Sequence, residues 1–364
     1  MAIIVPDGAP DPLGGPHAQG AAPHPSPLDG NRQASAITTP GGYLWWYFDA
    51  LTPEGDGLCC IFFVGSVFSP SYAVRLRHGE AALPTEHCAV NLALYRGGRK
   101  IAWVLSEYEE LGALGEDEFR VGQSAIRREG AGWRIELRER SAPFRRRIEG
   151  EIVVEPLTPP WRECAIGTIP GQPRSAHGWQ AAAPRARVTA RFSRPDFSVD
   201  TLGYHDRNYG DGRLEEAFSR WGWARFHGER ETTVLYSFTD RAGVERALWL
   251  RGGDGEGVTS STIDGGPDPI EEAAAPDGEL RRLRWGMRLP SSFGVGRPEH
   301  LRCEAGRLLE TAPFYARFAA RLVADGRPPV LGLGEYLDLD RFRAPGRQFL
   351  LRYLMRPTWR EPLV

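Results

Sequence analysis

The sequence has very little lysine and no excess of charge of either sign. Lys100 is the single lysine, and the 45 basic residues are balanced by 47 acidic ones, which leaves a net charge of −2 over 364 residues. Proteins that bind the phosphate backbone of nucleic acids usually carry a concentrated basic surface. The composition therefore argues against a nucleic acid as the partner.

Cysteine and metal-binding patterns are also sparse. The cysteines are odd in number and include no Cys-x-x-Cys pair; they are Cys59, Cys60, Cys88, Cys164 and Cys303. The eight histidines show no metal-ligand spacing. A disulfide framework or a structural zinc site needs such spacings. We therefore expect no metal, and a reducing cytoplasm is the simplest location.

Long apolar runs and several common catalytic motifs are absent as well. No run of 18 apolar residues is present to span a bilayer, and the N-terminus lacks the basic and apolar regions of a signal peptide. We expect a soluble protein, at most peripheral at the inner membrane surface. The chain has no Gly-x-Ser-x-Gly elbow and no Gly-x-Gly-x-x-Gly after a strand. These absences argue against an α/β-hydrolase and against a dinucleotide cofactor.

The residues that are abundant favour strands. Gly (43) and Pro (30) separate many short segments of the chain. Residues 133–138 and 186–192 alternate apolar and polar side chains, as half-buried antiparallel strands do. Many short strands with Gly and Pro turns predict an all-β barrel or sandwich. The 11 tryptophans would suit the lumen of a barrel.

The chain divides into a tail and two similar halves. Residues 1–35 are rich in Pro, Gly and Ala, which predicts a disordered tail. Two short strand patterns after residue 216 echo the two that open the ordered chain, a faint internal repeat. We therefore predict one antiparallel barrel over residues 36–215 and a second over residues 216–364.

The C-terminal segment has the pattern of a short helix. Residues 348–356 place Phe349, Leu350, Tyr353 and Leu354 against arginines, which is an amphipathic spacing. We interpret it as a helix that docks on a barrel. The alternative is a peripheral membrane contact that collects a lipid.

Reactive side chains are densest in residues 203–210. In a strand, alternate residues share a face, so Tyr204, Asp206 and Asn208 would point one way and His205 the other. An Asp with a Tyr and an amide in an apolar lumen forms an acid site where desolvation holds the carboxyl neutral. The alternative is a turn in which Asp and Asn bond to backbone groups.

Tryptophans near this acid favour the first interpretation. Trp45, Trp46, Trp221 and Trp223 lie where the two predicted barrels open, and Trp179 follows His177 closely. Each aromatic face stabilises a nearby cation by about 0.5 to 2 kcal/mol. Any single Trp more often serves core packing, but a group beside one protonated Asp suits cation chemistry. The predicted substrate-binding residues are Trp45, Trp46, Tyr47, His177, Trp179, Trp221 and Trp223.

The ordered part of the chain resembles the carotenoid 1,2-hydratases, also called hydroxyneurosporene synthases. The likeness runs from about residue 40 to about residue 350. Its motifs are residues 42–50 (GYLWWYFDA), 63–70 (FVGSVFSP), 86–95 (EHCAVNLALY), 177–179 (HGW), 203–210 (GYHDRNYG), 312–317 (APFYAR) and 339–342 (LDRF).

The resemblance implies two lipocalin-like β-barrel domains and a cofactor-free hydro-lyase. The substrates of the family are acyclic carotenoids with a terminal isopropylidene group. The acidic motif and the His-x-Trp element of the family correspond to Tyr204, His205, Asp206, Asn208, His177 and Trp179. The sequence departs from the family at Ser71, at Tyr209 and at Gly334; changes at Ser71 and Gly334 would reshape the substrate tunnel.

Hydration of an unactivated alkene needs a proton delivered to carbon. We expect Asp206 to be the donor, with His205 or Tyr204 to orient and reprotonate it. Trp223 and Trp46 would stabilise the carbocation, and Asn208 would hold the attacking water. Two other functions use the same fold: a lipocalin-like pericyclase that acts by shape, and a carrier that binds a polyene unchanged.

Overall fold

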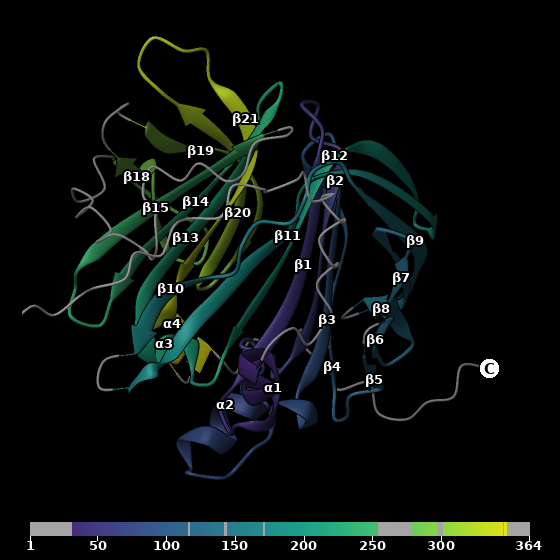
Figure 1. Cartoon of the computed structure of the whole chain (residues 1–364), viewed down its shortest axis with the longest axis vertical. Helices are drawn as coiled ribbons and strands as arrows, with labels where there is room; N and C mark the ends of the chain where they lie inside the picture. Colours follow the sequence, from purple (N-terminus) through teal and green to yellow (C-terminus); the bar gives the residue numbers. More distant parts are fainter. Residues whose placement is uncertain are drawn as a thin grey trace, which may run out of the picture.

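Two antiparallel β-sheets form the molecule, as seen in a computed structural model of the chain (Figure 1). The structure describes residues 31–347 except 116, 142–143, 170–171, 254–278, 297–300 and 345. The predicted helix at residues 348–356 lies outside this range. Figure 1 shows the first sheet in purple to teal beside the second sheet in green to yellow.

The first sheet has the order β4-β3-β2-β1-β12-β11-β9-β8-β7-β6-β5, and β10 pairs with β11. It curls so far that β4 approaches β8, which makes a half-barrel. Its strands are β1 (Tyr43–Leu51), β2 (Gly57–Val64), β3 (Cys88–Arg96), β4 (Arg99–Tyr108), β5 (Ala113–Leu114), β6 (Glu118–Val121), β7 (Ser124–Glu129), β8 (Gly132–Ser141), β9 (Arg146–Pro156), β10 (Cys164–Ile169), β11 (Gln172–Arg194) and β12 (Asp196–Gly210).

The second sheet has the order β15-β14-β13-β21-β20-β19-β18. Its outer strands β15 and β18 approach each other, so this barrel is nearly closed. A separate pair, β16 (Leu280–Arg282) and β17 (Arg288–Pro290), lies beside it. The strands of the second sheet are β13 (Phe218–His227), β14 (Glu231–Asp240), β15 (Glu245–Gly253), β18 (Ser292–Gly296), β19 (Leu301–Ala312), β20 (Tyr315–Val323) and β21 (Val330–Asp338).

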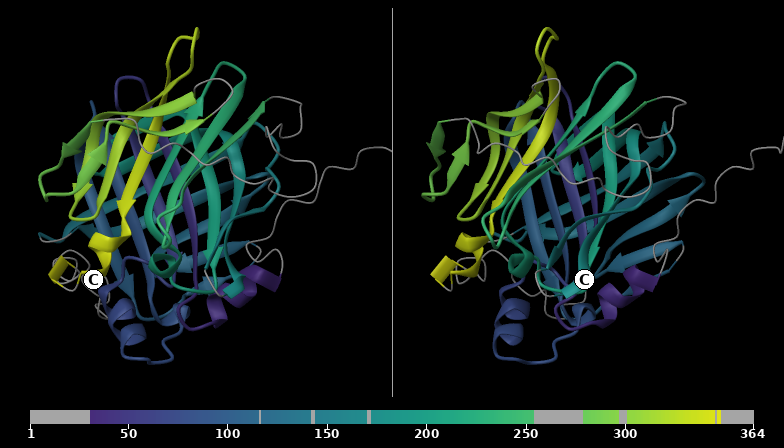
Figure 2. Two further views of the ribbon diagram at one scale, coloured as in Figure 1. Left: turned by 90° about the vertical axis from the view of Figure 1, so that its left-hand side faces the viewer. Right: turned by 60° about the vertical axis from the view of Figure 1, so that its left-hand side comes forward.

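The helices are short and lie together at one end of the sheets (Figure 2). They are α1 (Asn31–Thr38), α2 (Pro70–Arg77), the 3-10 turn η1 (Pro84–Glu86), α3 (Leu214–Ala217) and α4 (Leu339–Arg343). Helix α1 takes in the last five residues of the segment predicted to be a tail. Among the described residues no helix is long and apolar enough to cross a membrane. The prediction of an all-β chain with two lipocalin-like barrels is confirmed. The last helix described, α4, is short and precedes the segment predicted to be helical.

Apolar side chains form three layers. One fills the curl of the first sheet and includes Trp46, Phe48 and Trp133, and another fills the second barrel and includes Phe226 and Phe318. The third layer lies between the two sheets, on the faces that they turn toward each other. Strands β1 to β3 are therefore buried on both faces, which explains their nearly continuous apolar sequence. We call this third layer the intersheet layer.

Candidate active site

Asp206 lies in the middle of the intersheet layer. Strand β12 alternates, so Tyr204, Asp206 and Asn208 point together toward the second sheet, as the sequence predicts. Only 2% of the surface of Asp206 is exposed. The alternative interpretation of this segment as a turn is wrong, because it is a paired strand between β1 and β11.

Three side chains donate hydrogen bonds to the Asp206 carboxyl group. Trp179 Nε1 and Tyr204 Oη donate to Oδ2 at 2.8 and 2.9 Å, and Asn208 Nδ2 donates to Oδ1 at 2.7 Å. No basic side chain is among these partners. Burial raises the pKa of Asp206 from 3.8 to about 7, and the three donors oppose part of that rise. The carboxyl group is therefore close to half protonated near neutral pH.

A chain of hydrogen bonds fixes the amide of Asn208. Because Nδ2 faces Asp206, Oδ1 accepts from His177 Nε2 at 3.1 Å and from Tyr236 Oη at 3.3 Å. Burial lowers the pKa of His177 to about 3, so its ring is neutral and carries its proton on Nε2. His177 Nδ1 then accepts from Tyr43 Oη at 2.7 Å. The acceptor oxygen of Asn208 is fully used, so only the second N–H of its amide remains for the predicted role of holding the water.

Aromatic rings from both sheets enclose this acid. Trp223 of β13 lies with its ring centroid 5.4 Å from that of Tyr204 and 5.0 Å from that of Tyr47. Tyr236 of β14 meets Trp179 edge to face at 5.2 Å. Each of these aromatic residues is buried. Apart from the N–H and O–H groups that bind Asp206, these rings make its surroundings apolar.

Trp45 and Trp221 do not lie next to Asp206 but pack around His177, which is linked to Asp206 through Asn208. Their ring centroids are 5.5 and 4.6 Å from that of His177. Six of the seven residues predicted to bind the substrate thus lie in the intersheet layer: Trp45, Tyr47, His177, Trp179, Trp221 and Trp223.

Two predicted site residues lie on the wrong face. His205 stacks on Phe48 inside the curl of the first sheet, with ring centroids 4.0 Å apart, and bonds to the backbone oxygen of Tyr47. Trp46 packs there too, with the Arg207 guanidinium 4.4 Å from its ring centroid. Consecutive residues of a strand point to opposite faces, so neither one reaches Asp206. The predicted location was also wrong, because the acid lies between the sheets and not in a barrel lumen.

A row of paired residues leads from Asp206 to a cavity. Strand pairing aligns Asp206 with Tyr47, then Ile61, Asn91 and Leu105 across the first sheet. On the second sheet, the facing row is Tyr236, Trp223, Glu335, Arg317 and Glu310.

The cavity lies between these two rows and has a free volume of about 60 Å³. Its walls are Ile61, Phe68, Asn91, Trp103, Leu105, Glu310, Ala312, Phe314, Tyr315, Arg317 and Glu335. With neighbouring strands about 4.8 Å apart, the cavity begins about 10 Å from Asp206, at Ile61.

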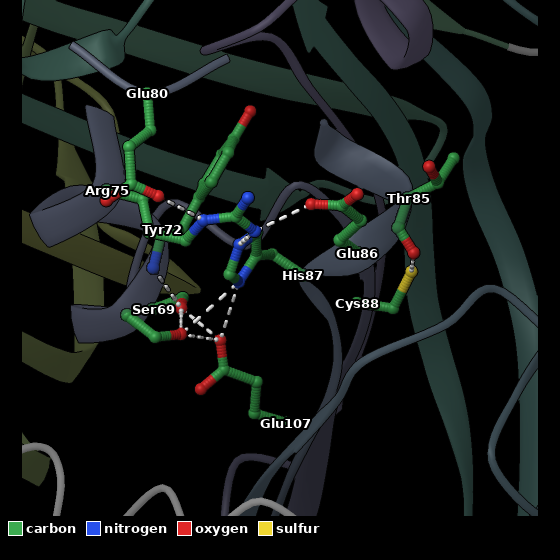
Figure 3. Close-up of polar contacts among 10 residues, drawn as sticks. Ser69, Tyr72, Arg75, Glu80, Thr85, Glu86, His87, Cys88 and Glu107 are labelled. Atoms are coloured by element: carbon green, nitrogen blue, oxygen red, sulfur yellow. Dashed lines mark hydrogen bonds and ion pairs between the residues drawn. The ribbon is translucent and has the colours of Figure 1, made fainter. Parts of the chain in front are cut away.

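A second polar cluster anchors helix α2 (Figure 3). Ser69 caps the helix and donates to Glu107, which also accepts from Ser71 at 2.8 Å. His87 Nε2 faces the Arg75 guanidinium at 3.3 Å, so the proton of His87 is on Nδ1, beside Glu107. No basic nitrogen is left to activate a serine, so this group does not fit a nucleophilic triad. Ser71 thus belongs to a structural anchor.

Gly334 faces away from the intersheet layer. A side chain there would meet Phe318 in the second barrel, with a Cβ contact of 2.5 Å. A side chain at this position would therefore fill the second barrel and not reach the layer that contains Asp206.

Sequence reasoning missed Tyr43 and Tyr236. Tyr43 begins β1 and Tyr236 lies on β14, and each reaches the site only through tertiary pairing. The repeat between the openings of the two halves gave a weak signal for Tyr236, because it placed this strand beside Trp223. Among the described residues, no group of three His, Cys, Asp or Glu side chains is arranged to hold a metal ion.

The fold and the site define a lipocalin-like protein of two barrels with a buried acid between them. A solved structure of a protein assigned as AttH from Nitrosomonas europaea has a similar fold, with a TM-score of 0.60 and 13% identity. The alignment covers 88% of this chain and 98% of that one.

Sequence comparison gives the family. The model of the carotenoid hydratase CrtC matches residues 60–360. The acyclic carotenoid 1,2-hydratase of Thiocapsa roseopersicina is 36% identical over 329 residues, which are 87% of this chain and 73% of that protein. The enzyme of the same name from Rhodobacter capsulatus is 31% identical over 313 residues, 83% of this chain and 99% of that protein. The chain belongs to this family of hydro-lyases, as its motifs predicted.

Proposed function

We propose that this protein adds water across the terminal double bond of an acyclic carotenoid or a related terpenoid, with Asp206 as the acid. The observation that carries the proposal is a buried carboxyl group that three donors hold among aromatic rings, and that forms no ion pair with any of the described residues. Its raised pKa keeps a useful fraction of the acid form near neutral pH.

The hydrogen bonds indicate which oxygen carries the proton. A carboxylate has about four acceptor positions, two on each oxygen. The described residues fill both positions on Oδ2 and one on Oδ1. The remaining position, on Oδ1, is the one from which Asp206 delivers its proton.

Protonation and water addition then follow in order. Asp206 gives its proton to the less substituted alkene carbon, and the π-electron pair forms the new C–H bond, which leaves a tertiary carbocation. The faces of Trp223, Tyr204 and Tyr236 stabilise that cation. Water attacks the cation, and the proton that it loses returns to the Asp206 carboxylate. The product is a tertiary alcohol, and the acid is restored.

Two groups other than the predicted Asn208 also suit the attacking water. Trp223 Nε1 and the hydroxyl of Tyr47 are buried, and among the described residues neither makes a hydrogen bond of normal length. The Tyr47 hydroxyl does lie near enough to Asp49 to lower the pKa of that carboxyl group. The two groups lie on adjoining rings beside Tyr204. A water molecule that bridges them would satisfy both groups and lie close to the cation.

Access of substrate requires motion of side chains. Pockets for ligands of drug size have volumes of about 300 to 1,000 Å³, far above the 60 Å³ of the cavity. The cavity walls include Phe68 and Trp103, which are only partly buried. We propose that these two rings move aside to admit an isoprenoid chain, which then runs along the intersheet layer to Asp206.

The test is the variant Asp206→Asn, assayed with lycopene, neurosporene and a shorter terpenoid in detergent. We expect polyene binding to persist and hydration to fall by at least about a hundredfold, the scale of a general acid. Mass spectrometry should detect the gain of one water in the wild type. In deuterated solvent, one deuteron should appear on the carbon beside the new alcohol.

The same experiment separates the two other functions. A pericyclase would keep its activity in Asp206→Asn, and a carrier would bind the polyene with no product from either form. Substantial hydration by the variant would remove Asp206 from its role. His205→Gln is the matched control, because it replaces the neighbouring residue on the opposite face of β12, and hydration should persist in it.

A further inference from the structure

The hairpin of strands β16 and β17 buries only part of its side chains. Leu283, Met287 and Leu289 pack into the apolar cluster of the second barrel. Two other large apolar side chains remain exposed, since Leu280 is 49% exposed and Trp285 is 46% exposed. Tryptophan is enriched at protein interfaces and at membrane boundaries. The exposed part of this hairpin is therefore a candidate contact surface.

The same hairpin carries four arginines, which are Arg281, Arg282, Arg284 and Arg288. All four are exposed, and residues 280–290 include no acidic residue. None of the four forms an ion pair with any residue that the structure describes. Arg282 lies directly opposite Arg288 in the strand pair. Like charges in that arrangement destabilise a hairpin, so this surface suits an anionic partner that neutralises them.

Helix α4 extends the basic surface toward the cavity. The guanidinium of Arg341 donates to the backbone oxygen of Trp285 at 2.6 Å and to that of Pro313 at 2.7 Å. Arg343 of the same helix is exposed. Phe314, the residue after Pro313, lines the cavity. The hairpin and α4 thus form one surface, which we call the basic face, and it adjoins the cavity wall.

One of the two rings that would move aside for the substrate also contacts this region. Phe68 packs on Phe314 with ring centroids 6.0 Å apart, and on Phe342 of α4 with ring centroids 6.4 Å apart. Ile61 and Leu105 give the cavity further apolar walls. A bilayer in contact with the basic face would therefore lie beside a cavity that can receive an apolar molecule.

We propose that the basic face binds the surface of a membrane that contains anionic lipids. Its arginines attract anionic headgroups, and Trp285 fits the boundary between the headgroups and the acyl chains. An acidic protein would also neutralise the arginines. A lipid surface is favoured because the basic face adjoins the apolar cavity, and an isoprenoid substrate dissolves in the bilayer. This choice of partner rests on the proposed function, whereas the attraction for anionic headgroups does not.

Flotation of the full chain with lipid vesicles tests the basic face. The probes are vesicles of phosphatidylcholine and vesicles of an equal mixture of phosphatidylcholine and phosphatidylglycerol, without any polyene. The wild type should bind the mixed vesicles at least about tenfold more tightly. The double variant Arg282→Gln/Arg288→Gln should bind them roughly thirtyfold more weakly, the effect of two arginines near an anionic surface. Brominated acyl chains in the mixed vesicles should quench tryptophan fluorescence in the wild type, and Trp285→Phe should lose most of that quenching.

The control is Arg187→Gln/Arg194→Gln, which removes two exposed arginines from β11 of the first sheet. Its binding to the mixed vesicles should match that of the wild type. Equal binding of the wild type to both kinds of vesicle, or equal losses in the two double variants, overturns the basic face as a membrane site. A wild type that binds neither kind of vesicle also overturns it, and points to an acidic protein. Because no polyene is present, membrane binding without a hydrated product in the Asp206 assay contradicts the hydratase proposal alone.

Discussion

At the scale of single residues, the proposed chemistry depends on a balance at Asp206. Burial favours the neutral acid, while the donors Trp179, Tyr204 and Asn208 favour the carboxylate. Without the donors the acid would be too weak to protonate an alkene, and without burial it would be ionised near neutral pH. The balance puts the pKa at about 7. Activity should therefore fall as the pH rises above 7, because the proton donor is lost.

The variant Trp179→Phe tests this balance. It removes the indole donor from Oδ2, so the ionised form loses a stabilising hydrogen bond and the pKa of Asp206 rises. The loss of activity at high pH should then begin at a higher pH than in the wild type. The measurement is the pH profile of kcat for both proteins.

Trp46→Phe is the control for this change. It also trims an indole to a phenyl ring, but in the curl of the first sheet, so its pH profile should match that of the wild type. A profile that stays in place in Trp179→Phe, or moves to lower pH, would show that this donor does not set the pKa.

At the scale of strands, one buried ion pair joins the two sheets. Arg225 of β13 donates from Nε to Asp49 Oδ1 of β1 at 2.7 Å, and both side chains are at most 2% exposed. Burial raises the pKa of Asp49 even with Arg225 beside it. The pair therefore fixes how β1 lies against β13, and with it how Tyr47 meets Trp223.

Removing Arg225 from this ion pair should lower the stability of the protein. Arg225→Met leaves Asp49 buried without its cation, and we expect the free energy of unfolding to fall by about 3 to 5 kcal/mol. Urea unfolding measures this change. The double variant that adds Asp49→Asn should recover part of the loss, since no buried charge remains.

The matched control is Arg187→Met in the pair that Arg187 forms with Asp200. These side chains are 58% and 49% exposed, and such pairs contribute at most about 1 kcal/mol. If Arg225→Met costs no more than Arg187→Met, the intersheet pair does not hold the sheets together.

At the scale of the whole molecule, the two sheets share one apolar layer. Trp179 of the first sheet and Trp221 and Trp223 of the second belong to the same buried cluster. The candidate active site is built from both faces of that layer, so neither sheet alone carries it. The sheets should therefore unfold together and not as independent domains.

Thermal unfolding followed by two signals tests this coupling. Tryptophan fluorescence reports largely on the intersheet layer, and far-UV circular dichroism reports on the strands of both sheets. We expect one transition with the same midpoint in both signals. Arg225→Met should lower both midpoints equally. Two separate transitions would contradict a shared layer.

The strand pattern alone determined much of this protein. Alternation in residues 133–138 and the Gly and Pro turns predicted antiparallel strands, and the same rule placed Tyr204, Asp206 and Asn208 on one face of β12. These inferences need only the local sequence, because alternate residues of a strand point to the same face. The same rule, applied to β1, places Trp46 and Tyr47 on opposite faces of the strand.

Only the tertiary structure decided which face each strand turns toward its neighbours. Period-two alternation does not state whether a face lines a barrel or meets a second sheet, and β1 is apolar on both sides. The pairing of β1 with β12 and the packing of β13 on them brought Tyr43, Tyr236 and Trp223 to Asp206. Those contacts join residues far apart in the chain, so their energies appear only once the strands have paired and the two sheets have packed together.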